Sequence, residues 1–98
     1  MVKLSAEQVK LQSLSKLAKG KHNGFKNWTT WVASLQLSNN ERAYNAVNTL
    51  IKNKKWSSTN RSARAWVAWA AAQENFKTPL LKKKFVDSVS FPQIKSSF

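Results

Sequence analysis

The sequence has no cysteine, two glycines, two prolines and four acidic residues among its 98 positions. Without cysteine, the chain can form no disulfide bond and no thiolate metal site. Because glycine and proline are scarce and no segment alternates strictly between apolar and polar residues, helices are predicted throughout. No apolar run approaches the roughly 18 residues that a membrane span requires, and the start of the chain, MVKLSAEQVK, lacks the apolar segment of a secretion signal. We therefore expect a soluble, cytoplasmic protein without integral membrane association.

Residue types suited to catalysis are equally scarce. The chain holds one histidine, His22, and four carboxylates, Glu7, Glu41, Glu74 and Asp87. These residues are not spaced as metal ligands, and no glycine-rich loop is available to hold a phosphate. Glu7 and Glu41 lie where helices are predicted to begin, and a negative charge there stabilises the helix dipole. We therefore expect no enzyme activity, no metal site and no cofactor.

Lysine and arginine dominate the charged residues. They number 17 against the four acidic residues, which gives a formal net charge of +13. A domain this basic is expected to be attracted to polyanions or to acidic surfaces. The charge is uneven, because residues 52–98 hold ten cations and two acids, whereas residues 23–51 hold two cations and one acid. The surface that selects a partner is therefore expected in the second half of the chain.

Capping signals and apolar spacing predict an all-α fold, a single compact bundle of four to five short helices in one domain. Ser5 and Gln8 form a capping box, with Leu4 and Val9 as a hydrophobic staple, and Gly20 ends the helix that they begin. The predicted helices cover residues 6–19, 28–37, 39–53 behind a Ser38 cap, 60–76 behind Ser58 or Thr59, and 79–88 behind Thr78, and Ser90 caps a last short turn. Residues 1–22 are expected to form a basic helix docked loosely on a core of residues 23–98.

Aromatic residues at helical spacing predict how the helices pack. Trp28, Trp31, Val32 and Leu35 follow the i, i+3, i+4, i+7 rule, and Tyr44 joins the apolar face of the next helix. Because large rings are well suited to fill a small core, we expect these rings to be buried. Phe91 and Ile94 are expected to fold back onto the bundle.

The stretch NGFKNWTTWVASLQLSNNERAYNAV, residues 23–47, is the most motif-like part of the chain. It resembles a family of small uncharacterised proteins from bacteriophages, plasmids and halophilic archaea, which carry the pattern N-G-aromatic-x-N-aromatic-x-T-W-x-V-x-L followed by N-x-E and a tyrosine. The matching residues are Asn23, Gly24, Phe25, Asn27, Trp28, Thr30, Trp31, Leu35, Asn39 or Asn40, Glu41 and Tyr44. Members also tend to end in a segment similar to Val89–Ile94.

The resemblance implies a helical fold and an origin in a virus or mobile element, so that the protein would work in the cytoplasm of a host cell. It implies no catalytic residue, because the family has no established activity. Members are commonly acidic and often have Leu-Trp where this chain has Leu35-Gln36. The excess of lysine is therefore a property of this protein and not of the family.

Trp56 lies among cations in a way that is typical of nucleic-acid contacts. It follows Lys52, Lys54 and Lys55 and precedes Arg61 and Arg64, so its ring could stack on a base while the cations hold phosphates. The alternative is that Trp56 folds down as a lid on the core, and the same two alternatives apply to Trp69. The candidate nucleic-acid-binding residues are Lys52, Lys54, Lys55, Trp56, Arg61, Arg64, Lys82, Lys83 and Lys84.

Two functions fit these features. The first is a small basic phage-type accessory protein that binds DNA or RNA, mainly non-specifically through phosphate, since three arginines in the chain offer little base readout. The alternative is an interaction module or inhibitor that docks on an acidic host or viral protein, such as an anti-defence or host-takeover factor. A third interpretation places residues 1–19 on a membrane surface as a basic amphipathic helix.

Overall fold

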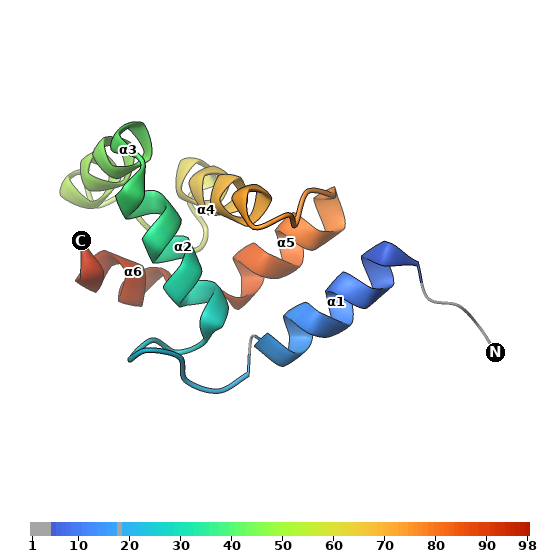
Figure 1. The fold of residues 1–98 in the computed structure, drawn as a ribbon. Coiled ribbons are helices and arrows are strands. Elements are labelled where there is room, and N and C mark those ends of the chain that lie inside the picture. Colours follow the sequence, from blue (N-terminus) through green and yellow to red (C-terminus); the bar gives the residue numbers. More distant parts are fainter. Residues whose placement is uncertain (1–4, 18) are drawn as a thin grey trace.

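The computed structural model describes residues 5–17 and 19–98 of the chain (Figure 1). These residues form no strand and six helices, namely α1 (Ala6–Leu17), α2 (Trp28–Asn39), α3 (Glu41–Lys52), α4 (Arg61–Gln73), α5 (Pro79–Ser88) and α6 (Phe91–Ser97). The all-α prediction is confirmed. The helices number six, not four to five, because the segment predicted as a last short turn forms the seven-residue helix α6.

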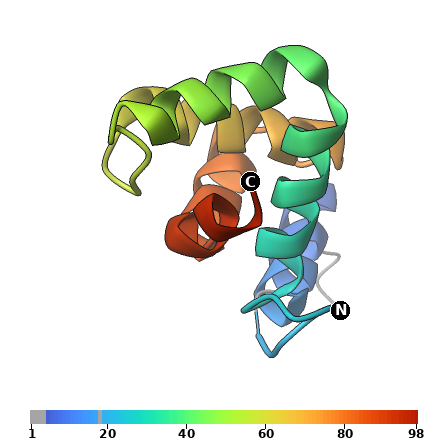
Figure 2. The same cartoon turned by 90° about the vertical axis from the view of Figure 1, so that its left-hand side faces the viewer.

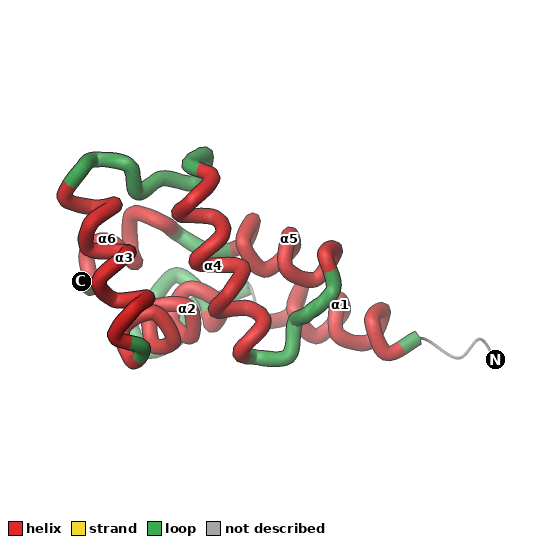
Figure 3. Tube along the Cα trace, turned by 90° about the horizontal axis from the view of Figure 1, so that it is seen from above, coloured by secondary structure: helices red, strands yellow, loops and turns green. Residues whose placement is uncertain are grey.

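Helix α2 lies at the centre of the arrangement and contacts α3, α4, α5 and α6. Helix α3 crosses α2 steeply, which is one of the two arrangements that the tight turn between them allows (Figure 2). Helices α4 and α5 lie against each other, and α1 packs on α5 at the end of the molecule away from α3 (Figure 3). The α4/α5 pair thereby presents five of the ten cations of residues 52–98.

All six helices contribute apolar side chains to one core. Phe85, Phe91 and Leu37 are among its largest fully buried residues, and Ile94 is also fully buried, so the prediction that the C-terminal segment folds back is confirmed. Helix α1 contributes Leu14, whereas Val9 is 48% exposed. Leu4, the other residue of the predicted staple, lies outside what the structure describes.

Most of the predicted helix starts are confirmed by their hydrogen bonds. The backbone N–H of Gln8 donates to Ser5 Oγ at 3.2 Å, and the backbone N–H of Ser5 donates to Gln8 Oε1 at 3.0 Å, which completes the capping box. Asn27, Thr78 and Ser90 cap α2, α5 and α6 as predicted. The starts of these helices are therefore set by local signals.

Two predicted caps are wrong. Helix α2 continues to Asn39, so Ser38 lies inside it, and its hydroxyl donates to the carbonyl of Ser34 at 2.7 Å. Asn40 caps α3 instead, and Asn60, one residue after the predicted pair, caps α4. Asparagine is as good an N-cap as serine, so spacing from serine alone cannot choose between neighbouring candidates. Because α2 extends to Asn39, Ser38 cannot cap the next helix, and Asn40 does so.

The predicted apolar stripe of α2 is only partly buried. Val32 is buried and Trp28 and Trp31 are half-buried, but Leu35 is 37% exposed and Tyr44 on α3 is 42% exposed. The face of α2 that enters the core carries Thr29, Thr30, Ala33 and Leu37. The prediction that Tyr44 and Leu35 are core residues is therefore wrong, because two threonines occupy the buried face in place of larger apolar residues.

Asn27 makes the burial of these threonines possible. Its Oδ1 accepts hydrogen bonds from the backbone N–H of Thr30 at 2.9 Å, from Thr29 Oγ1 at 3.0 Å and from Thr30 Oγ1 at 2.6 Å. Its Nδ2 donates to the carbonyl of Ser88 at 2.8 Å, and the backbone N–H of Ser90 donates to Thr30 Oγ1 at 3.0 Å. We call Asn27, Thr29, Thr30, Ser88 and Ser90 the α2 junction, since they join the start of α2 to the connection between α5 and α6.

Candidate nucleic-acid interface

The predicted phosphate-binding residues fall on three parts of the fold. Lys52 ends α3, and Lys54 and Lys55 lie exposed in the following loop. Arg61 and Arg64 occupy the first turns of α4, and Lys82, Lys83 and Lys84 form a run on α5. Together α4 and α5 carry five cations and a single carboxylate, Asp87. The paired helices are therefore the most strongly basic part of the fold.

Four of these cations surround one shallow hollow between α4 and α5. Its volume is about 250 Å³, and it is lined by Arg61, Arg64, Ala65 and Ala68 of α4 and by Lys82, Lys83 and Val86 of α5. The residues from α4 follow helical spacing and so form one face of that helix. We call Arg61, Arg64, Lys82 and Lys83 the α4/α5 basic surface. Lys84 lies elsewhere, in a second hollow of about 490 Å³ that it shares with Lys19 of the segment after α1.

Asp87 lies inside this basic region and engages two of its cations. Arg64 Nη2 lies 2.7 Å from Asp87 Oδ1, and Lys83 Nζ lies 3.1 Å from Asp87 Oδ2. Arg64 also donates from Nη1 to the carbonyl of Ser58 at 2.8 Å, which ties the α3–α4 loop to the helix pair. The hydrogen bond from Arg64, reinforced by Lys83 and opposed by partial burial, holds the pKa of Asp87 below its ordinary value. Asp87 is therefore ionised at neutral pH and attenuates the local positive charge.

Six predicted cations remain, of which Lys84 is unpaired among the described residues but lies outside the hollow. Within the described part of the chain, Arg61, Lys82 and the three lysines Lys52, Lys54 and Lys55 make no ion pair or side-chain hydrogen bond. A cation without an internal partner can contact a phosphate without first breaking a bond. We therefore place the candidate phosphate contacts at these five residues first and at Arg64 and Lys83 second.

Of the two alternatives predicted for Trp56, the structure shows the lid on the core and not an exposed stacking ring. Only 8% of Trp56 is exposed, its Nε1 donates to the carbonyl of Phe91 at 2.8 Å, and its ring centroid lies 5.3 Å from that of Phe91. This is the lid arrangement, in which the indole N–H finds a protein acceptor and the ring covers the core. A base cannot stack on Trp56 unless the loop first opens.

Comparisons with protein-family models, curated proteins and solved structures give no match to this chain. The likeness of residues 23–51 to a phage and haloarchaeal family therefore stays a prediction from the motif. The α2 junction supplies a structural reason for part of that motif, because Asn27 and Thr30 are needed to join α2 to the C-terminal helices.

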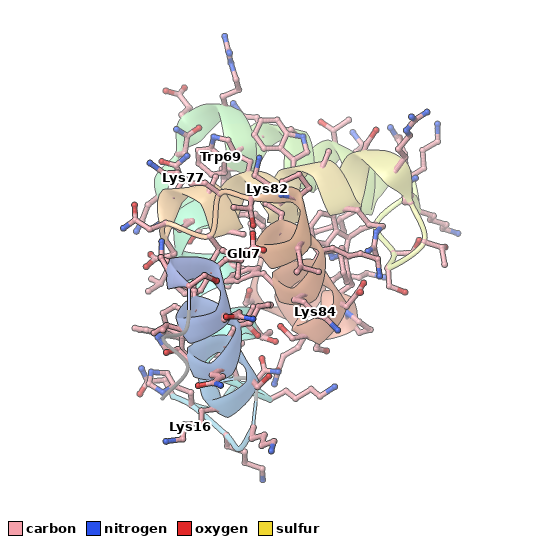
Figure 4. All side chains as sticks on the ribbon, turned by 90° about the vertical axis from the view of Figure 1, so that its right-hand side faces the viewer. Glu7, Lys16, Trp69, Lys77, Lys82 and Lys84 are labelled. Carbon is pink, nitrogen blue, oxygen red and sulfur yellow. The ribbon has the colours of Figure 1, made fainter. Side chains whose placement is uncertain are left out.

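Trp69, for which stacking and a lid role were both left open, lies on α4 one turn beyond Ala65, a residue that lines the hollow of the α4/α5 basic surface. It is half-buried on α4 and packs edge-on against Trp66, with the ring centroids 5.8 Å apart at 72°. Figure 4 shows Trp69, Lys77 and Lys82 toward one end of the view, with Lys84 farther along and Lys16 at the other end on α1. Helical spacing alone could have found Trp69, because it follows Ala65 by four residues and Ala68 by one.

The described residues were also compared with the requirements of a metal site and of a membrane span. They contain no group of three or more metal-ligating side chains, and none of their helices has the length and apolar character to span a membrane. The ring of His22 lies 4.6 Å from that of Trp31, where it covers part of that indole. His22 is therefore a packing residue of the loop before α2.

Proposed function

We propose that this protein binds nucleic acid, mainly through contacts from the α4/α5 basic surface and from Lys52, Lys54 and Lys55 to backbone phosphates. The observation that carries the proposal is the hollow between α4 and α5, where two helices bring four cations together around one depression. The Ser58–Arg64 hydrogen bond links this surface to the loop that carries Lys54 and Lys55. DNA and RNA both offer the phosphates that such a surface recognises.

The number of free cations is sufficient for measurable binding. Each phosphate contact on a duplex contributes about −0.9 to the slope of log affinity against log salt, so about five contacts predict a several-hundredfold loss of affinity between roughly 50 and 200 mM salt. Non-specific binding of this kind lies near the micromolar range at the lower salt concentration. Sequence preference is expected to be small, because the arginines that could read base edges are few and Arg64 is already engaged by Asp87.

A pair of charge-matched variants tests the proposal. Arg61→Ala with Lys82→Ala removes two free cations from the hollow, and Lys16→Ala with Lys95→Ala removes the same charge from α1 and α6. In fluorescence anisotropy with a labelled duplex, the first variant is expected to lose about tenfold in affinity and about 2 in salt slope, while the second stays close to the parent protein. Equal losses in both variants, or no binding by the parent at about 50 mM salt, would refute the proposed surface.

A second candidate function, docking on an acidic host or viral protein, is supported by a different face of the molecule. Leu35 and Tyr44 are exposed, and the Tyr44 ring stacks on the C-terminal Phe98 with centroids 5.4 Å apart. Exposed apolar residues of this size are typical of contact surfaces when they are contiguous. Capture of partners from host lysate with and without nuclease separates the two functions, since partners that survive nuclease favour docking and partners that disappear favour nucleic acid.

A further inference from the structure

Trp69 lies one helical turn beyond Ala65 of the α4/α5 basic surface, and its side chain is half-buried. On α4 it shares a face with Ala65 and Ala72, and Ala65 lines the same hollow as Lys82. The ring is held by its edge-on contact with Trp66, so little conformational freedom would be lost when a flat ligand stacks on it.

The indole nitrogen of Trp69 distinguishes it from Trp56. Trp56 Nε1 is bonded to the carbonyl of Phe91, whereas Trp69 Nε1 has no acceptor among residues 5–17 and 19–98 and is not buried. The polar edge of Trp69 is therefore in contact with solvent. Trp31 and Trp66 share this open edge, so the place of Trp69 on α4, one turn beyond Ala65 of the basic surface, carries the argument.

A ring beside cations is suited to an unpaired base. Aromatic side chains stack on bases of any sequence, while nearby cations hold the phosphates that connect those bases. In a duplex both faces of each base are covered by its neighbours, and a base must leave the stack before it can reach a protein ring. Trp69 together with Lys82 and Arg61 is consequently matched to a single strand and not to a duplex.

We infer that the α4/α5 basic surface binds single-stranded nucleic acid, with an unpaired base on Trp69 and adjoining phosphates at Lys82 and Arg61. This inference rests on the proposed function and deepens it, since it names the form of nucleic acid. It requires that the protein bind a single strand more tightly than a duplex. Charge alone favours the duplex, which has the higher charge density, so a preference for the single strand requires a contribution from stacking.

The experiment compares Trp69→Leu, which keeps apolar volume on α4 but removes the aromatic face, with Trp31→Leu as a matched control. Trp31 is also half-buried and has an unbonded Nε1, but it lies on α2. Anisotropy is measured with a thymidine oligonucleotide of about 16 nucleotides and with a duplex of the same length. The parent protein is expected to prefer the single strand, and Trp69→Leu is expected to weaken single-strand binding by at least about fivefold, with unchanged duplex binding.

Each outcome has a separate meaning. Unchanged single-strand affinity in Trp69→Leu, or an equal loss in Trp31→Leu, overturns the inference but leaves the proposed function standing. Failure of the parent protein to bind either nucleic acid overturns the proposed function itself. Should Trp69→Leu fail to fold, photocrosslinking of the parent protein to an iodouracil-substituted oligonucleotide decides the matter, since a crosslink at Trp69 supports the inference and crosslinks only at other residues overturn it.

Discussion

The start of α2 and the paired helices α4 and α5 both bring tryptophans toward the surface, but they use their polar residues in opposite ways. In the α2 junction the amide of Asn27 and the hydroxyl of Thr30 bond to other parts of the chain and are buried. On the α4/α5 basic surface Arg61 and Lys82 form no ion pair or side-chain hydrogen bond with the described residues and line an open hollow. The most motif-like stretch of the sequence therefore holds the fold together, and the less distinctive alanine- and lysine-rich segment is the one that we propose binds a ligand.

The largest expected effect is a loss of stability when the α2 junction is disrupted. Asn27→Ala removes the cap of α2 and the acceptor of two buried hydroxyls, so we expect the free energy of unfolding to fall by about 3 kcal/mol. Asn40→Ala is the matched control, because Asn40 also caps a helix but is exposed and makes a single capping bond to Ala43. Its cost is expected to be about 1 kcal/mol. Chemical denaturation of both variants checks the difference, and equal losses would contradict the structural role of the junction.

A smaller loss of stability is expected at Trp56. Trp56→Phe removes the hydrogen bond to the carbonyl of Phe91 and leaves that buried carbonyl without its donor, at a cost of about 1.5 kcal/mol in the free energy of unfolding. Nucleic-acid affinity should stay the same, because the ring of Trp56 is covered. Thermal unfolding and anisotropy together check this prediction. A loss of affinity without loss of stability would restore Trp56 as a stacking residue.

The lysines around the α3–α4 loop test the other half of the comparison, which is the binding of nucleic acid. Replacement of Lys52, Lys54 and Lys55 by alanine is expected to lower duplex affinity by about tenfold at low salt, with little change in stability, because all three are exposed and unpaired. The control replaces Lys16, Lys21 and Lys26, which are also exposed but belong to α1 and to the segment before α2. A larger loss in the control would move the interface to that end of the molecule.

The smallest expected effect comes from Asp87. Asp87→Asn removes the only carboxylate of α4 and α5 and releases Arg64 and Lys83, so affinity for a duplex should rise by about threefold and the salt slope should become steeper. A salt titration by anisotropy measures both quantities. Unchanged affinity would show that Arg64 and Lys83 do not reach the phosphates.

The lowered pKa of Asp87 also fixes the sign of a small pH effect. A carboxyl whose pKa is lower in the folded than in the unfolded state stabilises the fold at every pH above its unfolded pKa, and this contribution disappears as the pH falls through the folded pKa. Because the side chain of Asp87 is 42% exposed, solvent screens its ion pairs and the contribution is small. Asp87→Asn should remove it, which acid titration of the unfolding midpoint can detect.

Local rules predicted the helices of this protein better than its buried faces. The caps Asn27, Thr78 and Ser90 depend on residues within three positions, and sequence is sufficient to find them. The burial of Thr29 and Thr30 depends on the nearby Asn27 and also on the α5–α6 connection, which lies about sixty positions away and bonds to both Asn27 and Thr30. A count of apolar spacing cannot include such partners, and it therefore assigned the core to larger side chains.

The candidate site was likewise predictable in its local features but not in the contacts between helices. The cations of α4 and α5 could be identified on each helix from their spacing, but only the packing of the two helices shows that Arg61 and Lys82 border one hollow. Trp56 lies in a loop, where periodicity gives no direction for a side chain, and its burial follows from a contact with Phe91. The ion pair of Asp87 could not be predicted from the sequence, because its partner Arg64 lies on another helix.

Mapping of backbone amide chemical shifts during titration with a single-stranded oligonucleotide tests the central claim most directly. The account predicts that the largest changes fall on α4 and α5, at Arg61, Trp69, Lys82 and Lys83, with smaller changes at Lys54 and Lys55. The amides of the α2 junction should remain unchanged. Changes concentrated instead at Trp28, Trp31 and Tyr44 would contradict the assignment of structure to one region and binding to the other.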